Sequence, residues 1–140
     1  MKKFVFVLQL LCMLYALQVS GQPKEASTVI EGIYWSPKKD AKIQIYRKGT
    51  KYFGKTVWLT KPGKDIKNPV AALRERALLG LELLSNFEWH DDEYSGGKIY
   101  DPESGKTYDC KMALNGDVLK VRGYIGISML GRTERFVRVQ

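Results

Sequence analysis

The chain is poor in the residues that metal sites and most nucleophilic active sites require. Its 140 residues include one histidine and two cysteines. Metal sites need several converging ligands, and His90 stands beside only Asp91 and Asp92 in a predicted turn. A Ser–His–Asp arrangement would have to use the same histidine, and no nucleophile-elbow motif is present. The sequence therefore predicts no catalytic residue, no metal and no cofactor.

Long apolar runs are also scarce. The longest, Phe4 to Leu17, is shorter than the roughly 20 residues of a membrane-spanning helix. Two lysines precede it, and the small or modest residues Val19-Ser20-Gly21 follow it, which is typical of a secretory signal over residues 1–21. An uncleaved N-terminal anchor is the alternative. We expect an exported protein, periplasmic or extracellular after cleavage near Gly21, with no transmembrane segment in the mature chain.

Signal cleavage would leave 119 residues, enough for one domain. Residues 22–29 form a polar leader, and residues 30–140 are predicted to form the single domain. Loss of Cys12 with the signal would leave Cys110 alone and exclude an intramolecular disulfide. An exported domain of this kind must depend on its hydrophobic core.

The chain is predominantly basic. The formal net charge is +8, and it falls to +6 without Lys2 and Lys3. Such a surface suits an anionic envelope component or ligand, whereas a merely soluble basic surface is the simpler alternative. No recognisable nucleic-acid-binding module is present, so nucleic acid is not an expected partner.

What the chain does have is alternation of apolar and polar residues with a period of two. The clearest case is Tyr108 to Leu114, followed by an Asn115-Gly116 turn and then Leu119 to Ile125. Asn-Gly favours tight hairpin turns, so these two strands are predicted to be antiparallel neighbours. Eight such segments are expected: Ile30–Trp35, Ala41–Tyr46, Tyr52–Leu59, Leu81–Trp89, Tyr94–Tyr100, Tyr108–Leu114, Leu119–Ile125 and Arg132–Val139.

This pattern predicts an all-β fold, an antiparallel barrel of about eight strands, with an open sandwich as the alternative. The alternation does not decide which face of the last strand points inward, because Phe136 lies on one side and Val137 on the other. One short helix of two to three turns is expected between the third and fourth strands. Asn68-Pro69 would cap it, and Val70, Leu73 and Ala77 recur at helical spacing.

Aromatic and arginine residues are the candidates for binding. In a small barrel the aromatic rings either fill the core or line a ligand cavity, and both interpretations stay open. For a ligand in the barrel or at its mouth, Trp58, Tyr100 and Tyr124 would supply apolar contacts. The residues that would anchor a polar head group are Arg74, Arg122 and Arg132.

Three segments together resemble a known bacterial family. They are Gly54-Lys55-Thr56-Val57-Trp58-Leu59, the run from Gly96 to Tyr108, and Val121 to Gly126 continued by Leu130-Gly131-Arg132-Thr133. This combination is similar to the family catalogued as domain of unknown function 2147, which consists of small exported proteins. The resemblance implies a lipocalin-like β-barrel and no established activity. It also implies a cysteine at the place of Phe53, able in other members to pair with the counterpart of Cys110.

Three functions are compatible with these features. The first is a non-catalytic binder of a small amphipathic or lipid-like ligand in the cell envelope. The second is an envelope protein that interacts through its basic exterior and the segment from Lys61 to Gly80, with a filled barrel. The third is an enzyme with a carboxylate pair such as Asp101 with Glu103 or Asp109, although alternation places Asp109 opposite the apolar face. The sequence determines neither the ligand nor the oligomeric state.

Overall fold

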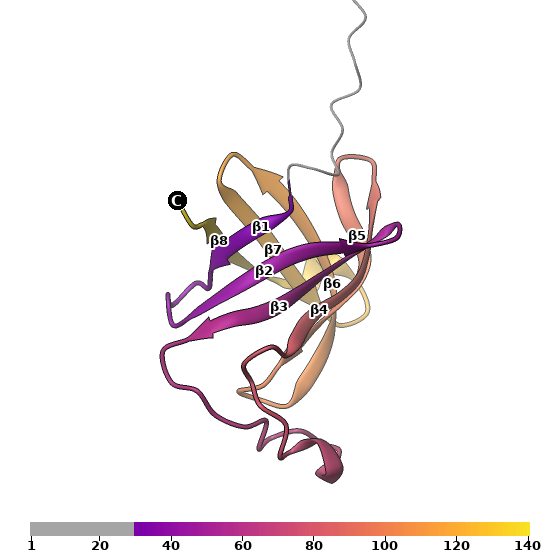
Figure 1. Cartoon of the computed structure of the whole chain (residues 1–140). Helices are drawn as coiled ribbons and strands as arrows, with labels where there is room; N and C mark the ends of the chain where they lie inside the picture. The colour runs from indigo at the N-terminus through magenta and orange to yellow at the C-terminus, as the bar shows by residue number, and fades with distance from the viewer. Residues whose placement is uncertain (1–29) are drawn as a thin grey trace, which may run out of the picture.

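A computed structural model describes residues 30–140, which form a closed barrel of eight antiparallel strands connected in sequence order. Figure 1 shows the barrel with its long connection below it. The strands are β1 (Gly32–Trp35), β2 (Ala41–Lys48), β3 (Lys51–Leu59), β4 (Glu82–His90), β5 (Glu93–Asp101), β6 (Lys106–Asn115), β7 (Val118–Tyr124) and β8 (Arg132–Arg138). The eight-stranded barrel is therefore confirmed and the open sandwich is wrong. The proposed signal and leader lie outside the described residues.

Closure of the barrel depends on a short seam between the first and last strands. β1 pairs with β8 through only two residue pairs, Tyr34 with Arg138 and Trp35 with Val137. The Arg138 guanidinium strengthens the seam by donating hydrogen bonds to the Tyr34 hydroxyl at 2.7 Å and to the Glu31 carbonyl at 3.0 Å. The other neighbouring strands share more residue pairs, from three between β3 and β4 to eight between β2 and β3. The Asn115-Gly116 turn joins β6 to β7 with φ of 59° at the glycine.

The centre of the barrel is filled by side chains. Tyr34, Phe87, Tyr94, Leu119 and Cys110 are each at most 2% exposed. A side chain beside a cavity that admits water would retain accessible surface, so no such cavity adjoins these five. Phe136 faces Leu119 across the β7–β8 pair and packs against the core, whereas Val137 points outward. The core aromatics therefore fill the interior, and the inward face of the last strand is the one that carries Phe136.

Cys110 is a free, fully buried thiol on the inner face of β6. Phe53, in contrast, stacks on Tyr46 with ring centroids 5.9 Å apart and faces Tyr46 across the β2–β3 pair, where Ile45 takes the inner face. Position 53 thus lies on the outer face of the barrel wall and position 110 on the inner face. The cysteine pairing implied by the family resemblance does not fit this geometry.

Burial should make Cys110 unreactive. It raises the pKa of the thiol to about 12, so the nucleophilic thiolate is scarce at neutral pH. We expect iodoacetamide at pH 8 to leave the Cys110 peptide unmodified in the folded protein and to alkylate it fully in urea. Peptide mass spectrometry measures both states. Rapid alkylation without denaturant would show that the wall at β6 opens readily.

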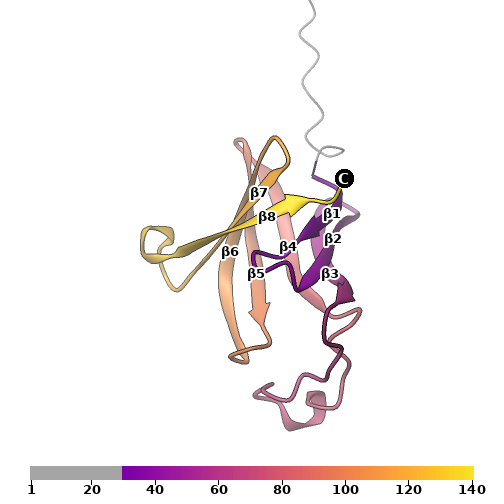
Figure 2. The same cartoon turned by 90° about the vertical axis from the view of Figure 1, so that its left-hand side faces the viewer.

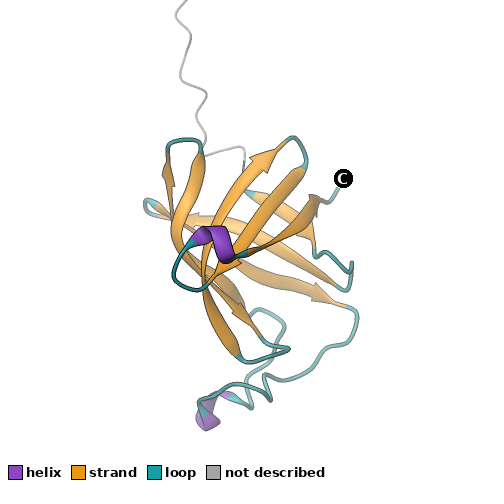
Figure 3. Cartoon of the chain, turned by 180° about the vertical axis from the view of Figure 1, so that it is seen from behind, coloured by secondary structure: helices purple, strands orange, loops and turns teal. Residues whose placement is uncertain are grey.

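The predicted helix of two to three turns is wrong. The structure has only a 3-10 turn, η2 (Ala71–Leu73), in this connection (Figure 3). Two causes are visible. Arg76 and Leu78 are held by backbone hydrogen bonds to Asp65 and Gly63, so a helix cannot continue through them. Val70 and Leu73 are 53% and 38% exposed, and so short a helix is unstable without a face to pack.

Candidate functional site

The connection between β3 and β4, residues 60–81, leaves one end of the barrel and doubles back on itself; we call it the excursion (Figure 1). Its two limbs are joined where the Asp65 amide donates to the Arg76 carbonyl at 3.0 Å and the Leu78 amide to the Gly63 carbonyl at 2.9 Å. Its base is fastened to β3, since the Gly80 amide donates to the Thr56 carbonyl at 2.9 Å and the Thr56 hydroxyl donates to the Leu78 carbonyl. The excursion is thus an ordered part of the fold.

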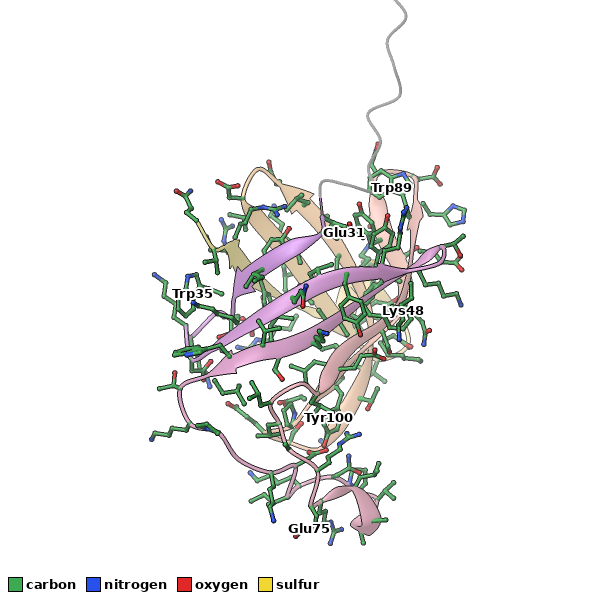
Figure 4. All side chains as sticks on the ribbon, viewed as in Figure 1. Glu31, Trp35, Lys48, Glu75, Trp89 and Tyr100 are labelled. Carbon is green, nitrogen blue, oxygen red and sulfur yellow. The ribbon has the colours of Figure 1, made fainter. Side chains whose placement is uncertain are left out.

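A buried carboxylate fixes the excursion to the outside of the barrel wall. Asp65 is 0% exposed and accepts three hydrogen bonds. One comes from the Tyr100 hydroxyl on β5 at 2.5 Å, and one each from Asn68 Nδ2 and Arg76 Nε at 2.8 Å. Figure 4 shows Tyr100 where the excursion meets the barrel, with Glu75 at the far end of the excursion. We call these four residues the Asp65 cluster.

Hydrogen bonding determines the charge state of the Asp65 cluster. Burial by itself would raise the pKa of Asp65, but the hydrogen bonds from Tyr100, Asn68 and Arg76 and the charge of Arg76 outweigh it, so the pKa is lowered. Burial and the neighbouring carboxylate raise the pKa of Tyr100, so its hydroxyl keeps its proton and remains a donor. At neutral pH the cluster contains an ionised, fully bonded carboxylate.

The excursion should therefore detach in acid. Because the pKa of Asp65 is lower when folded, its stabilising contribution is complete above the ordinary pKa of an aspartate and is lost as the pH falls through the lowered value. We expect the Asn68 side-chain amide signals to stay constant from pH 7 to pH 5 and to shift only below the ordinary aspartate range. NMR measures this titration, and Asp65→Asn should abolish it. A transition centred above pH 5 would contradict the assignment to Asp65.

A hollow of about 330 Å³ lies between the excursion and the outer faces of β4, β5 and β6. The excursion contributes Pro69, Leu73 and Arg76, and the wall contributes Leu83, Ser85 and Tyr100 among others. Its lining thus combines three apolar side chains, Pro69, Leu73 and Leu83, with polar and charged groups that include Arg76, Glu82 and Lys98. Arg76 uses Nε for Asp65 and lies with its guanidinium carbon 5.5 Å from the Tyr100 ring centre.

The other charged residues of this hollow are already paired. Lys98 forms an ion pair with Asp109, while Glu82 accepts a hydrogen bond from the Tyr46 hydroxyl at 2.7 Å and lies 3.5 Å from Lys48 Nζ. Arg76 is itself ion-paired with Asp65, but only through Nε, so its two terminal nitrogens are the donors that a ligand in the hollow could use. The arrangement suits a small molecule with an apolar body and an anionic head.

A second hollow of about 350 Å³ lies at the opposite end of β4 and β5. Its lining is polar and includes Lys51, Glu88, His90 and Ser95. Within residues 30–140, no three histidine, cysteine or acidic side chains are grouped so as to hold a metal. The proposed carboxylate pair is not inside the barrel either, because Asp109 is ion-paired to Lys98 and Asp101 caps the following turn through the Glu103 amide and the Ser104 hydroxyl.

The structure separates the six residues proposed for ligand binding. Tyr100 lines the first hollow, and Arg74 lies beside it with Nε donating to the Asn68 carbonyl at 2.8 Å. Trp58 is on the outer face, its ring 5.7 Å from that of Trp35. The other three residues, Arg122, Tyr124 and Arg132, are on the β7–β8 hairpin.

Sequence reasoning missed Asp65, and Arg76 is not among the six residues proposed for ligand binding. The available signal is Asn68-Pro69, which by itself predicts a helix cap. In the structure the Asn68 side chain does accept a hydrogen bond from the Val70 amide at 2.8 Å, but it caps a turn and also donates to Asp65. The 35-residue separation of Asp65 from Tyr100 leaves no local pattern from which their contact could be inferred.

Comparison with known proteins identifies the family of this chain. The model of a family described as "Uncharacterized protein conserved in bacteria (DUF2147)" matches residues 32–138, the whole barrel. The chain belongs to the DUF2147 family. No curated protein matches this DUF2147 chain.

A solved structure has the same architecture as this DUF2147 protein. It is HP1028 of Helicobacter pylori, described as belonging to the lipocalin family. The two share 25% sequence identity with a TM-score of 0.71, over 79% of this chain and 82% of the other. The DUF2147 barrel is therefore lipocalin-like. Among the described residues, no helix has the length and apolar character to cross a membrane.

Proposed function

We propose that this protein is a non-catalytic binder of a small amphipathic ligand in the bacterial cell envelope. The observation that carries the proposal is the hollow of about 330 Å³, which brings the apolar side chains of Leu73 and Leu83 together with the Arg76 guanidinium. Because the middle of the barrel is filled, the ligand is assigned to the outer wall beneath the excursion. The ligand would lay its apolar body against Leu73 and Leu83 and direct an anionic head toward Arg76.

Several features support this assignment. The Asp65 cluster holds Arg76 and Tyr100 in place before a ligand arrives, and preorganised sites lose less entropy on binding. The lipocalin-like fold of a family without an assigned activity is compatible with binding, although a fold alone does not determine function. The N-terminal signal motif supports an exported location, periplasmic or extracellular.

Interaction with another envelope component is the second candidate. It is favoured by three apolar side chains on the excursion that remain exposed, Ile66 at 68%, Val70 at 53% and Leu79 at 50%. Exposed apolar side chains of this kind are available for contact with a partner. In this alternative the excursion itself would be the contact surface and the hollow beneath it would hold only solvent.

Two matched variants test the ligand proposal. Ser85 lines the first hollow and Ser95 the second, and both serines are part of the β4–β5 ladder. Native mass spectrometry of protein purified gently from its host's envelope should show a lipid or metabolite adduct in the wild type. Ser85→Trp, which fills the first hollow, should abolish the adduct, whereas Ser95→Trp should retain it. Titration with 1-anilinonaphthalene-8-sulfonate, an amphipathic anion, should rank the three proteins in the same way.

Other results would reject the proposal. A clean apoprotein mass together with equal dye binding by all three proteins would favour the interaction role. Loss of the adduct in Ser95→Trp alone would move the ligand to the polar hollow at the opposite end of the strands.

A further inference from the structure

The loop between β7 and β8 presents an exposed apolar surface outside the hollow and the excursion. It contains the 3-10 turn η3 (Ser128–Leu130) and projects away from the barrel, as Figures 2 and 3 show. Four of its side chains are mostly exposed, namely Ile125 at 74%, Ile127 at 58%, Met129 at 85% and Leu130 at 79%. We call these four residues the apolar tip. Their exposure in water is unfavourable, so the tip is expected to have a partner.

One arginine fixes the backbone of the loop that carries the apolar tip. Arg122 on β7 donates from Nε to the Ser128 carbonyl at 2.6 Å and from a terminal nitrogen to the Met129 carbonyl at 3.2 Å. Its other terminal nitrogen donates to the Thr133 hydroxyl at 2.8 Å. Three hydrogen bonds from one guanidinium fix the loop against β8. The loop backbone is thus held in the conformation that leaves the apolar side chains exposed.

The outer face of the same hairpin is basic. Lys120 faces Arg135 across the β7–β8 pair, and Arg122 faces Thr133 one step nearer the tip on the same side. None of these three cations forms an ion pair with a carboxylate of residues 30–140. The hairpin's own acid, Glu134, lies opposite the inward-facing Val121 and pairs with Arg132 at 2.8 Å. We call Lys120, Arg122 and Arg135 the basic strip.

We propose that the apolar tip and the basic strip together form a docking site for an anionic lipid surface. The shape favours a membrane, because the tip is a projecting loop that can enter the interface, whereas stable protein contacts need a broad complementary surface. The charge favours anionic lipid, because each unpaired cation near such a surface adds attraction. The site is separate from the ligand hollow, and the proposal does not depend on the proposed function.

Vesicle sedimentation tests this proposal with the exported protein. Wild-type protein should sediment with phosphatidylglycerol vesicles and not with phosphatidylcholine vesicles. The double variant Ile127→Ser/Met129→Ser should bind phosphatidylglycerol about tenfold more weakly or worse, since two apolar side chains no longer enter the bilayer. Lys120→Gln/Arg135→Gln should also weaken binding and reduce its sensitivity to salt.

A matched control uses the excursion, whose exposed apolar residues are unrelated to the tip. Ile66→Ser/Leu79→Ser should bind vesicles as the wild type does. All forms carry the same N-terminus, so differences report on the substituted positions, and equal thermal melting would show that the exposed changes leave the barrel folded. Equal vesicle binding by wild type and tip variant would overturn the proposal. So would sedimentation equilibrium showing a wild-type dimer that the tip variant abolishes, because the tip would then contact a second copy.

Discussion

Replacing Phe87 with alanine should lower the free energy of unfolding by about 3–5 kcal/mol, the usual cost of removing a buried aromatic ring from a core. Phe87 is 0% exposed and belongs to the central cluster with Leu84 and Tyr94. Gly97, which lies against the Phe87 ring on the neighbouring strand β5, has no side chain that could refill the space. Urea unfolding followed by tryptophan fluorescence measures the change.

Gly97 allows a more specific test of how the Phe87 ring is packed. A Cβ atom built on Gly97 would lie 2.5 Å from two atoms of the Phe87 ring, a distance that real structures do not tolerate. Gly97→Ala alone should therefore destabilise the barrel by about 1–3 kcal/mol through overpacking. In the Phe87→Ala background the same methyl group enters empty space. The two substitutions should then be strongly non-additive, with the double variant more stable than the sum of the single effects predicts.

Gly63→Ala is the matched control for the methyl group. A Cβ atom at Gly63 meets only Leu78 Cδ1 at 3.8 Å, an ordinary contact, so stability should change little. Simple additivity of Phe87→Ala and Gly97→Ala would show that the ring does not occupy the space above Gly97.

Asp65→Ala should release the excursion while the barrel stays folded. The substitution removes the acceptor of three hydrogen bonds and leaves the Arg76 guanidinium without its carboxylate. A hydrogen bond to a charged group contributes about 1.5–3 kcal/mol to stability. The contribution of the Arg76 bond is smaller, because its side chain is about one third exposed and solvent screens the ion pair. Trypsin should then cleave at Lys67, Arg74 and Arg76 at least about tenfold faster, as expected when local opening becomes about 1.4 kcal/mol easier.

Glu75→Ala provides the control within the same segment. Glu75 pairs with Lys64 at 2.5 Å, but its side chain is 79% exposed, and surface ion pairs of this kind stabilise proteins little. Its cleavage rate should match that of the wild type. Circular dichroism would verify that the Asp65→Ala barrel retains its strands. Equal protease resistance of both variants would show that the contacts with β3, rather than the Asp65 cluster, hold the excursion.

The barrel was predictable from local patterns and the excursion was not. Residues 107–125 alternate cleanly around Asn115-Gly116, and each inward position contacts a core that any closed sheet would supply. In the excursion, by contrast, Val70, Leu73 and Ala77 have the spacing of an apolar helix face, although the segment is not an α-helix. Their conformation is determined by Asp65 and by a tyrosine on a strand that comes later in the chain. Helical spacing predicts a helix only where a face is available to bury it.

The candidate site was also predictable only in part. Residue type identified Tyr100 and Arg122 as candidates, but sequence could not show that they serve different surfaces. Tyr100 reaches a carboxylate 35 positions earlier, whereas Arg122 bonds to carbonyl groups only six and seven positions later. Arg76, the cation of the hollow, was no more conspicuous than the other arginines. Its importance comes from a contact across the chain, which composition and spacing do not encode.

The two-pair seam between β1 and β8 has a consequence for how the chain acquires its fold. The side chains that meet there belong to residues 104 positions apart, so the contact closes nearly the longest loop the domain allows. Loop closure of that size is entropically costly, and few backbone pairs reward it. The hairpins β2–β3, β4–β5, β5–β6, β6–β7 and β7–β8 can form from neighbouring residues before the ring is complete, whereas β3 and β4 pair across the excursion. Folding should thus first produce a curved sheet, and the pairing of β1 with β8 should close it into a barrel in the last step. On heating, the barrel should open first at this β1–β8 seam.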